Sequence, residues 1–120
     1  MTLTREQILA QRQIPLRIET VPVPEWGGDV LIREWSGTER DTFENHFVTK
    51  DGKRDLEAAK YARAYMVVDS VIGEDGRHEF TLKDVEPLAE LSAAALDRIF
   101  KKARDLNNMS DKDVDDIEKN

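Results

Sequence analysis

The histidines and carboxylates of this chain do not have the spacing of a metal-binding site. The two histidines, His46 and His78, are 32 positions apart, and neither belongs to an H-x-x-x-H or H-E-x-x-H pattern. A calcium loop also fails, because counting back from Gly52 or Gly76 as its sixth position places an apolar residue where the first aspartate is required. We therefore expect no metal ion and no cofactor.

The sequence also contains no motif typical of nucleophilic catalysis or of phosphate binding. The chain has no cysteine, and its serines at 36, 92 and 110 stand where helix N-caps are expected. Gly27 and Gly28 lie between two strand-like runs rather than between a strand and a helix, so they do not form a phosphate-binding loop. The basic run Lys101–Arg104 is expected to be a solvated helix face. We expect a protein that is not an enzyme.

The two tryptophans are the more informative residues. Trp35 ends the second strand-like run and is expected to pack on a helix. Trp26 stands beside two glycines, where a large ring is harder to bury. Two interpretations of Trp26 stay open, packing in the core and contact with a partner, because exposed tryptophans often mark binding surfaces.

Composition narrows the class of protein further. The 120 residues include 18 basic and 25 acidic side chains, a formal charge of −7, which argues against binding nucleic acid. The longest apolar run, Ala64–Val68, is far too short to span a bilayer, and the N-terminus lacks the apolar core of a secretory signal. We expect a soluble cytoplasmic protein that contacts neither nucleic acid nor membrane.

Hydrophobic periodicity predicts an α+β fold, with a β-hairpin at about residues 16–35 packed on about four helices. The first strand contains Pro22, so it is expected to lie at an edge or to stop near Val21. A short N-terminal helix has so few apolar residues that we expect it to order only when docked. Four of the predicted helices span residues 4–13, 55–72, 93–106 and 111–119. Two more are expected to begin after the capping residues Ser36 and Thr81.

These elements are expected to form one globular domain over residues 1–109. The last eleven residues contain five acidic and two basic side chains. Residues 110–120 are therefore expected to form an acidic tail or a short helix, free to move or to fold on a partner.

Three segments carry a resemblance to a known family. The string V-P-E-W-G-G-D-V-L-I-R at residues 23–33 resembles the hairpin of the tail assembly chaperones of long-tailed bacteriophages. The segment S-G-T-E-R-D-T-F-E at residues 36–44 and the helix S-A-A-A-L-D-R-I-F at residues 92–100 are similar as well. The likeness covers most of the chain, although Trp35 stands where a smaller residue is expected.

The resemblance implies a non-enzymatic assembly factor that binds the tape measure protein and keeps it soluble while the tail tube polymerises. It implies work in the cytoplasm of the infected bacterium and absence from the mature virion. The major tail tube protein and a second copy of the chain are further candidate partners. Candidate contact residues are Trp26, Gly27, Gly28, Val114 and Ile117.

Other interpretations stay open beside the chaperone. A structural component of the tail or the head–tail junction, retained in the virion, is the first alternative. An inhibitor that imitates nucleic acid is a further alternative. It would need carboxylates spaced along one face like phosphates, whereas the helices of this chain carry both acidic and basic residues.

A longer form made by ribosomal frameshifting is a further hypothesis, which the resemblance suggests. The ending Glu118-Lys119-Asn120 is compatible with codons that form a slippery adenine run.

Overall fold

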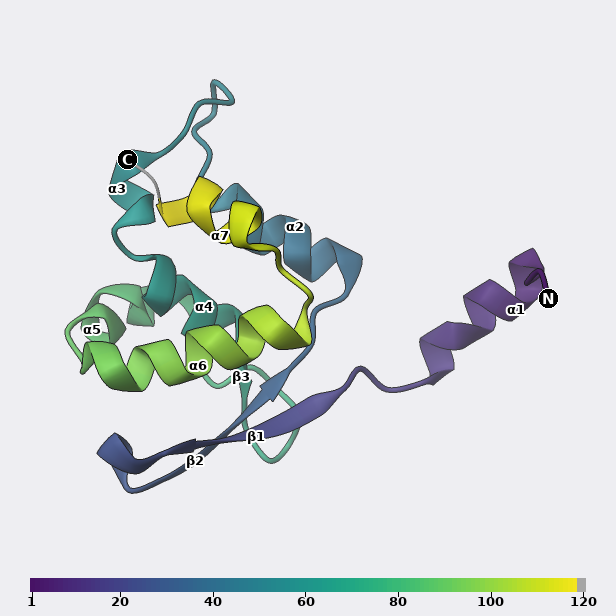
Figure 1. Ribbon diagram of the computed structural model, residues 1–120, viewed down its shortest axis with the longest axis horizontal. Helices are drawn as coiled ribbons and strands as arrows, with labels where there is room; N and C mark the ends of the chain where they lie inside the picture. Colours follow the sequence, from purple (N-terminus) through teal and green to yellow (C-terminus); the bar gives the residue numbers. More distant parts are fainter. Residues whose placement is uncertain (119–120) are drawn as a thin grey trace.

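The computed structural model describes residues 1–118, and the side chains of residues 1–114. It shows an antiparallel sheet with helices packed on one face and an N-terminal segment that projects from the start of the first strand (Figure 1). The predicted α+β class is confirmed.

The hairpin is formed by β1 (Ile18–Val23) and β2 (Gly28–Arg33), which pair from Ile18 with Arg33 to Val23 with Gly28. A 3₁₀ turn, η2 (Pro24–Trp26), and Gly27 with a φ of 73° connect them. β1 extends past Val21, and its Pro22 is tolerated because the strand order β1-β2-β3 leaves β1 at the edge. Of the two predictions for this strand, the edge position is confirmed.

The predicted helix over residues 55–72 is wrong in two respects. It is divided into α3 (Leu56–Ala59) and α4 (Ala62–Ser70), because Tyr61 leaves the helical region with φ −107° and ψ 19°. Its last two residues form β3 (Val71–Ile72), which pairs with Leu31 and Ile32 of β2. Val71 and Ile72 are β-branched and could belong to a buried helix or to a strand. They form a strand because the edge of β2 is free to pair with them.

The remaining helices begin where the sequence predicts them. The side chains of Thr4, Ser36 and Thr81 cap their elements in capping boxes, and Ser92 caps its helix with one hydrogen bond. The first predicted helix is α-helical in its first half only. The elements are α1 (Arg5–Leu9) with η1 (Ala10–Gln13), α2 (Gly37–Asn45), η3 (Leu82–Asp84) with α5 (Val85–Ala89), α6 (Ala93–Leu106) and α7 (Asp111–Glu118).

Trp35 joins the sheet to the helices. Its side chain is 7% exposed and its ring centroid lies 4.7 Å from that of Phe43 in α2. The indole Nε1–H donates to the backbone oxygen of Asp69 in α4 at 2.8 Å, and the backbone N–H donates to Oδ1 of Asn107 at the end of α6, also at 2.8 Å. The predicted packing of Trp35 on a helix is confirmed.

Glu39 holds the start of α2 to the sheet through three polar contacts. Its carboxylate accepts from the N–H of Ser36 at 3.0 Å and from Arg33 at 2.9 Å, and His78 Nε2 lies 3.2 Å away. Burial raises the pKa of Glu39, but these hydrogen bonds and the positive charge of Arg33 lower it by more. The charged carboxylate is therefore the form that stabilises the fold.

The Trp35→Ala substitution tests the junction between sheet and helices. We expect it to lower the free energy of unfolding by about 3–5 kcal/mol, because it leaves a cavity and an unpaired carbonyl. Urea denaturation measures the change. Trp26→Ala is the matched control, since that ring is 39% exposed, and a similar loss at both tryptophans would contradict the assignment.

Glu39→Gln tests the charge of the α2 cap. The amide oxygen still accepts from Ser36, but the ion pair with Arg33 is lost. Because the pKa of Glu39 is lowered in the folded state, its stabilising effect is present at neutral pH and disappears as the pH falls below about 5. We expect the free energy of unfolding of the variant to fall less steeply on acidification, with a difference at pH 7 of about 1 kcal/mol or less.

Thermal or urea unfolding over a pH series measures this slope. Asp41→Asn, at an exposed position of the same helix, is the control and should keep the slope of the unaltered protein. An identical slope for the Glu39→Gln variant would contradict the role of the carboxylate.

Candidate functional site

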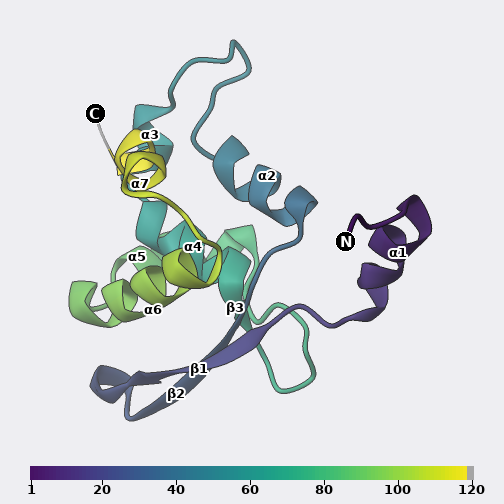
Figure 2. The same ribbon diagram turned by 45° about the vertical axis from the view of Figure 1, so that its right-hand side comes forward.

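The structure places the predicted contact residues at two separate ends of the molecule. Trp26, Gly27 and Gly28 form the exposed tip of the hairpin, whereas α7 lies beside α2 and α3 at the far end in both views (Figures 1 and 2). Val114 of α7 is 9% exposed and belongs to the core cluster. Ile117 lies in α7, outside the residues whose side chains are described. These candidates therefore cannot form one surface.

A groove extends from the hairpin tip along β2 to β3 and the segment after it, and we call it the hairpin groove. Its volume is about 320 Å³, and its lining is mainly apolar. Trp26 comes from the turn, Val30 from β2, and Phe80 from the segment between β3 and η3. The complete lining is Trp26, Asp29, Val30, Leu31, Val67, Val71, Ile72, Gly73, Glu74, Glu79 and Phe80.

Acidic residues line the same groove. Asp29 of β2 and both Glu74 and Glu79 of the segment after β3 are exposed. A tight turn presents this segment, in which the N–H of Gly73 donates to the oxygen of Arg77 at 2.8 Å. An apolar surface with an acidic margin suits a partner that is apolar in the centre and basic at its sides.

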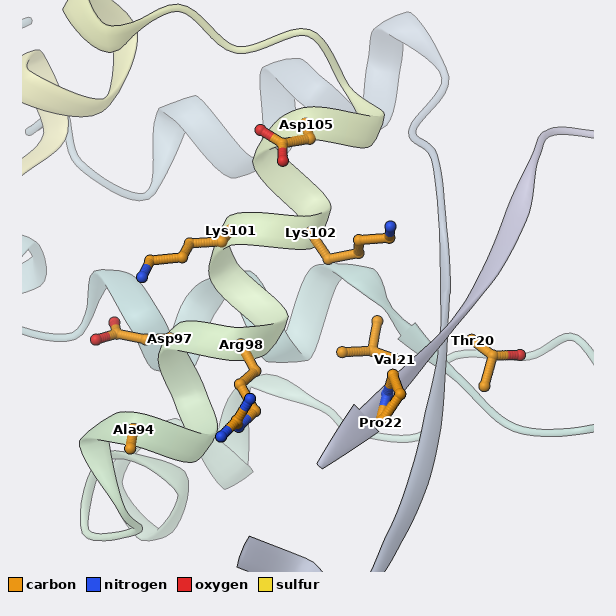
Figure 3. A pocket seen from close by; sticks show the side chains of 9 residues that line it. All are labelled: Thr20, Val21, Pro22, Ala94, Asp97, Arg98, Lys101, Lys102 and Asp105. Carbon is orange, nitrogen blue, oxygen red and sulfur yellow. The ribbon is translucent and has the colours of Figure 1, made fainter. Parts of the chain in front are cut away.

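A second groove, of about 580 Å³, lies between β1 and α6 (Figure 3). Its lining residues are Thr20, Val21, Pro22, Ala94, Asp97, Arg98, Lys101, Lys102 and Asp105. Lys102 points from α6 toward β1, whereas Lys101 lies on the other side of the helix (Figure 3). This groove is larger than the hairpin groove, but it is rich in charge.

Most charged residues of this second groove are paired with residues outside its lining. Arg98 Nε donates to Glu25 at 2.8 Å, and this hydrogen bond lowers the pKa of the Glu25 carboxyl. Lys102 Nζ lies 3.0 Å from Glu19 Oε2. An apolar partner would have to cover these ion pairs without replacing them, which is unfavourable. The hairpin groove is therefore the better candidate for an apolar ligand.

Two further features of the described part of the chain concern metal binding and membrane crossing. Among those residues, no three histidine or carboxylate side chains are grouped so as to hold a metal ion. No described helix is long and apolar enough to cross a membrane.

Sequence reasoning identified Trp26 but missed Val30, Phe80 and Glu74. The segment at residues 73–80 shows only a turn signal in the sequence. Its proximity to Trp26 results from the pairing of β3 with β2, which the sequence analysis did not predict. The sequence feature that could have indicated this pairing is Val71-Ile72, two β-branched residues at the end of a helical pattern.

Comparison with known proteins gives one consistent result. Residues 4–120 match the family model described as phage tail assembly chaperone. Among solved structures, the chain is similar to the bacteriophage HK97 tail assembly chaperone, with 26% identity and a TM-score of 0.58 over 83% of this chain and 97% of that chain. No curated protein matches the chain.

The hairpin tip that carries Trp26 is tested by a pair of glycine substitutions. Gly27 has a φ of 73°, a left-handed conformation that strains other residues, whereas Gly28 does not, and neither has an atom within 4 Å of an added Cβ. We expect Gly27→Ala to lower the free energy of unfolding by about 1–2 kcal/mol and Gly28→Ala to change it by less than about 0.5 kcal/mol. Thermal unfolding compares them, and equal effects would contradict the turn.

Proposed function

This chain belongs to the phage tail assembly chaperone family, and we propose that it acts in that role by binding the tape measure protein. The bound form would keep the apolar stripes of that long helical protein from aggregating until the tail tube assembles around it. The chaperone would work in the cytoplasm of the infected bacterium and be absent from the mature virion.

The hairpin groove is the observation that supports this proposal. A helix with a narrow apolar stripe places apolar side chains at every third or fourth position, and a groove lined by Trp26, Val30 and Phe80 would accept such a stripe. Lysine or arginine side chains beside the stripe would face Asp29, Glu74 and Glu79. The expected client segment is therefore an amphipathic helix with basic flanks.

The size and charge of the surface suit reversible binding. A groove of about 320 Å³ covers only a few client side chains, so many copies along a long client would each bind weakly. A formal charge of −7 per chain makes the coated client acidic, and coated clients would repel each other. Weak contacts at each position allow the polymerising tube to displace the chaperone.

Co-expression with the tape measure protein of the same phage tests this function. The Trp26→Lys variant removes one aromatic residue from the lining of the groove and adds a positive charge, whereas Trp26→Phe keeps an aromatic ring. We expect the unaltered chain and Trp26→Phe to hold most of the tape measure protein in the soluble fraction. Trp26→Lys should weaken binding of the client about tenfold, which is about 1.4 kcal/mol, and should therefore leave a smaller soluble fraction.

Circular dichroism must first show that the Trp26→Lys variant keeps its fold. Equal solubilisation by Trp26→Lys and Trp26→Phe would place the client elsewhere on the chain. No effect of the unaltered chain on the client would refute the chaperone function itself. Mass spectrometry of purified virions separates the chaperone from a retained tail component, since only the latter would be found there.

A further inference from the structure

The first strand of the sheet has a free edge. In the described part of the chain, the strand order β1-β2-β3 gives β2 two neighbours and β1 only one. The N–H of Glu34 donates to the backbone oxygen of Arg17 at 2.8 Å, one position before the first pair of the hairpin. Opposite residues of antiparallel strands alternate between pairs that exchange hydrogen bonds and pairs that do not. Ile18, Thr20 and Pro22 therefore turn their backbone groups away from β2 and toward the edge.

These backbone groups form a row of polar atoms along the edge. Ile18 and Thr20 each present an N–H and a C=O, whereas Pro22 presents a C=O only. All three residues are exposed, and no hydrogen bond of these backbone groups is described among residues 1–118. Such a row is a template for another extended segment, because a main chain in that conformation repeats its donors and acceptors with the same spacing.

The larger of the two grooves lies along this edge, between β1 and α6 (Figure 3). Its volume of about 580 Å³ is within the range of about 300–1,000 Å³ that is typical of ligand sites. Neighbouring strands lie about 4.8 Å apart, so a strand added to β1 would enter this groove and have α6 beside it. Domains of the PDZ type bind an extended segment by adding it to a sheet edge, with affinity from main-chain hydrogen bonds and specificity from alternate side chains.

Every second side chain of such a segment would point toward α6. On β1, Glu19 and Val21 point that way, since Glu19 lies 3.0 Å from Lys102 of α6 and Val21 is buried. Paired residues project to the same side of a sheet, so the added side chains would meet Arg98 and Lys102. These two cations remain 48% and 47% exposed, although each already contacts a glutamate. A carboxylate can accept further hydrogen bonds from them, whereas a basic side chain would be repelled.

The other charges beside the groove do not reverse this preference. Asp97 accepts from Arg63 at 2.6 Å, and Asp105 lies 3.4 Å from Arg104. Together with the two cation–glutamate pairs, these make four neutral pairs. Lys101, for which no ion pair is described among residues 1–114, leaves the lining with one positive charge, although the whole chain carries −7. The groove therefore favours an acidic segment.

Pro22 sets the length over which a segment can pair. Because proline has no N–H, the row of donors ends at Thr20, and the turn η2 begins two residues after Pro22. The edge from Ile18 to Pro22 thus accepts a segment of about five residues. The missing donor also opposes continued growth of the sheet by further strands.

We propose that the edge of β1 binds a short, extended, acidic segment of a partner protein, which becomes a fourth strand of the sheet in the groove beside α6. Main-chain hydrogen bonds to Ile18 and Thr20 hold the segment, and its alternate carboxylates lie beside Arg98 and Lys102. This groove shares no lining residue with the hairpin groove. The segment and a client helix can therefore be bound at the same time, and the site is additional to the proposed function.

An NMR titration of the full chain with a synthetic peptide tests the edge. The probe is the capped heptapeptide Thr-Glu-Thr-Glu-Thr-Glu-Thr, which favours an extended conformation and has a carboxylate at every second position. The titration is done at about 0.15 M salt, where distant charges are screened. We expect saturable shifts of the amide signals of residues 17–23, with a Kd below about 1 mM, and little change at residues 73–80.

Two matched peptides separate the main-chain and charge contributions. N-methylation of the threonines in the probe removes the donors that would face β1 and keeps every charge. Lysine in place of each glutamate keeps the donors and reverses the charge. We expect each peptide to bind at least about tenfold more weakly than the probe. Unchanged affinity of the N-methylated peptide would overturn strand addition, and unchanged affinity of the lysine peptide would overturn the preference for an acidic segment.

Thr20→Pro tests the same edge from the side of the protein. It removes an outward N–H that β2 does not use, and an extended edge strand tolerates proline. Thr20→Val is the matched control, because it keeps the N–H and the β-branched shape. We expect Thr20→Pro to bind the probe at least about tenfold more weakly and Thr20→Val to bind it within about twofold of the unaltered chain.

Equal binding of the probe by the two folded variants would overturn the assignment of the edge. Circular dichroism checks their fold, and if Thr20→Pro does not fold, the N-methylated peptide with the unaltered chain decides the question. Failure of the probe to bind the unaltered chain would overturn the proposal. Shifts at residues 17–23 that depend on chain concentration without peptide would assign the edge to a second copy and would overturn it too.

This titration contains no tape measure protein, so it does not depend on the proposed function. Binding of the probe by a chain that fails to solubilise the client would refute only the chaperone function. Solubilisation of the client by a chain that does not bind the probe would refute only the edge site.

Discussion

The anchoring of Trp35 is the interaction on which the arrangement of the whole molecule depends. Its ring packs on Phe43, its Nε1–H donates to Asp69, and its backbone N–H donates to Asn107. One residue just after β2 thus fixes α2, α4 and α6 against the sheet. Because α4 continues directly into β3, the same anchor sets where β3 meets β2 and where the loop after it must lie.

Local patterns in the sequence predicted where helices and turns begin, but they predicted less well which elements contact each other. Capping at Ser36 and Ser92 and the turn at Gly27 depend on neighbouring residues, so pattern reasoning located them. The helical pattern ends at Val71-Ile72 because these residues pair with β2, about forty positions earlier in the chain. Hydrophobic periodicity cannot reveal such a distant pairing. The groove beside Trp26 needs that pairing, and for this reason only one of its apolar residues was predicted.

The surfaces of this chain suit the contact between polypeptides that we propose. An acidic body carries the apolar hairpin groove with its acidic neighbours, and the N-terminal segment, residues 1–16, with exposed apolar side chains and a net positive charge, leaves from the opposite end of the hairpin. The larger groove between β1 and α6 has its charges paired within the chain. In a member of the phage tail assembly chaperone family, such a division is compatible with the weak, repeated and displaceable binding proposed above.

Hydrogen–deuterium exchange of the chaperone, alone and in complex with the tape measure protein, tests the central claim most directly. The account predicts slower exchange on binding at residues 24–31 and 73–80, which border the hairpin groove, and little change in α6. Slower exchange confined to the outer face of α6 and the edge of β1, with the hairpin tip unaffected, would contradict it.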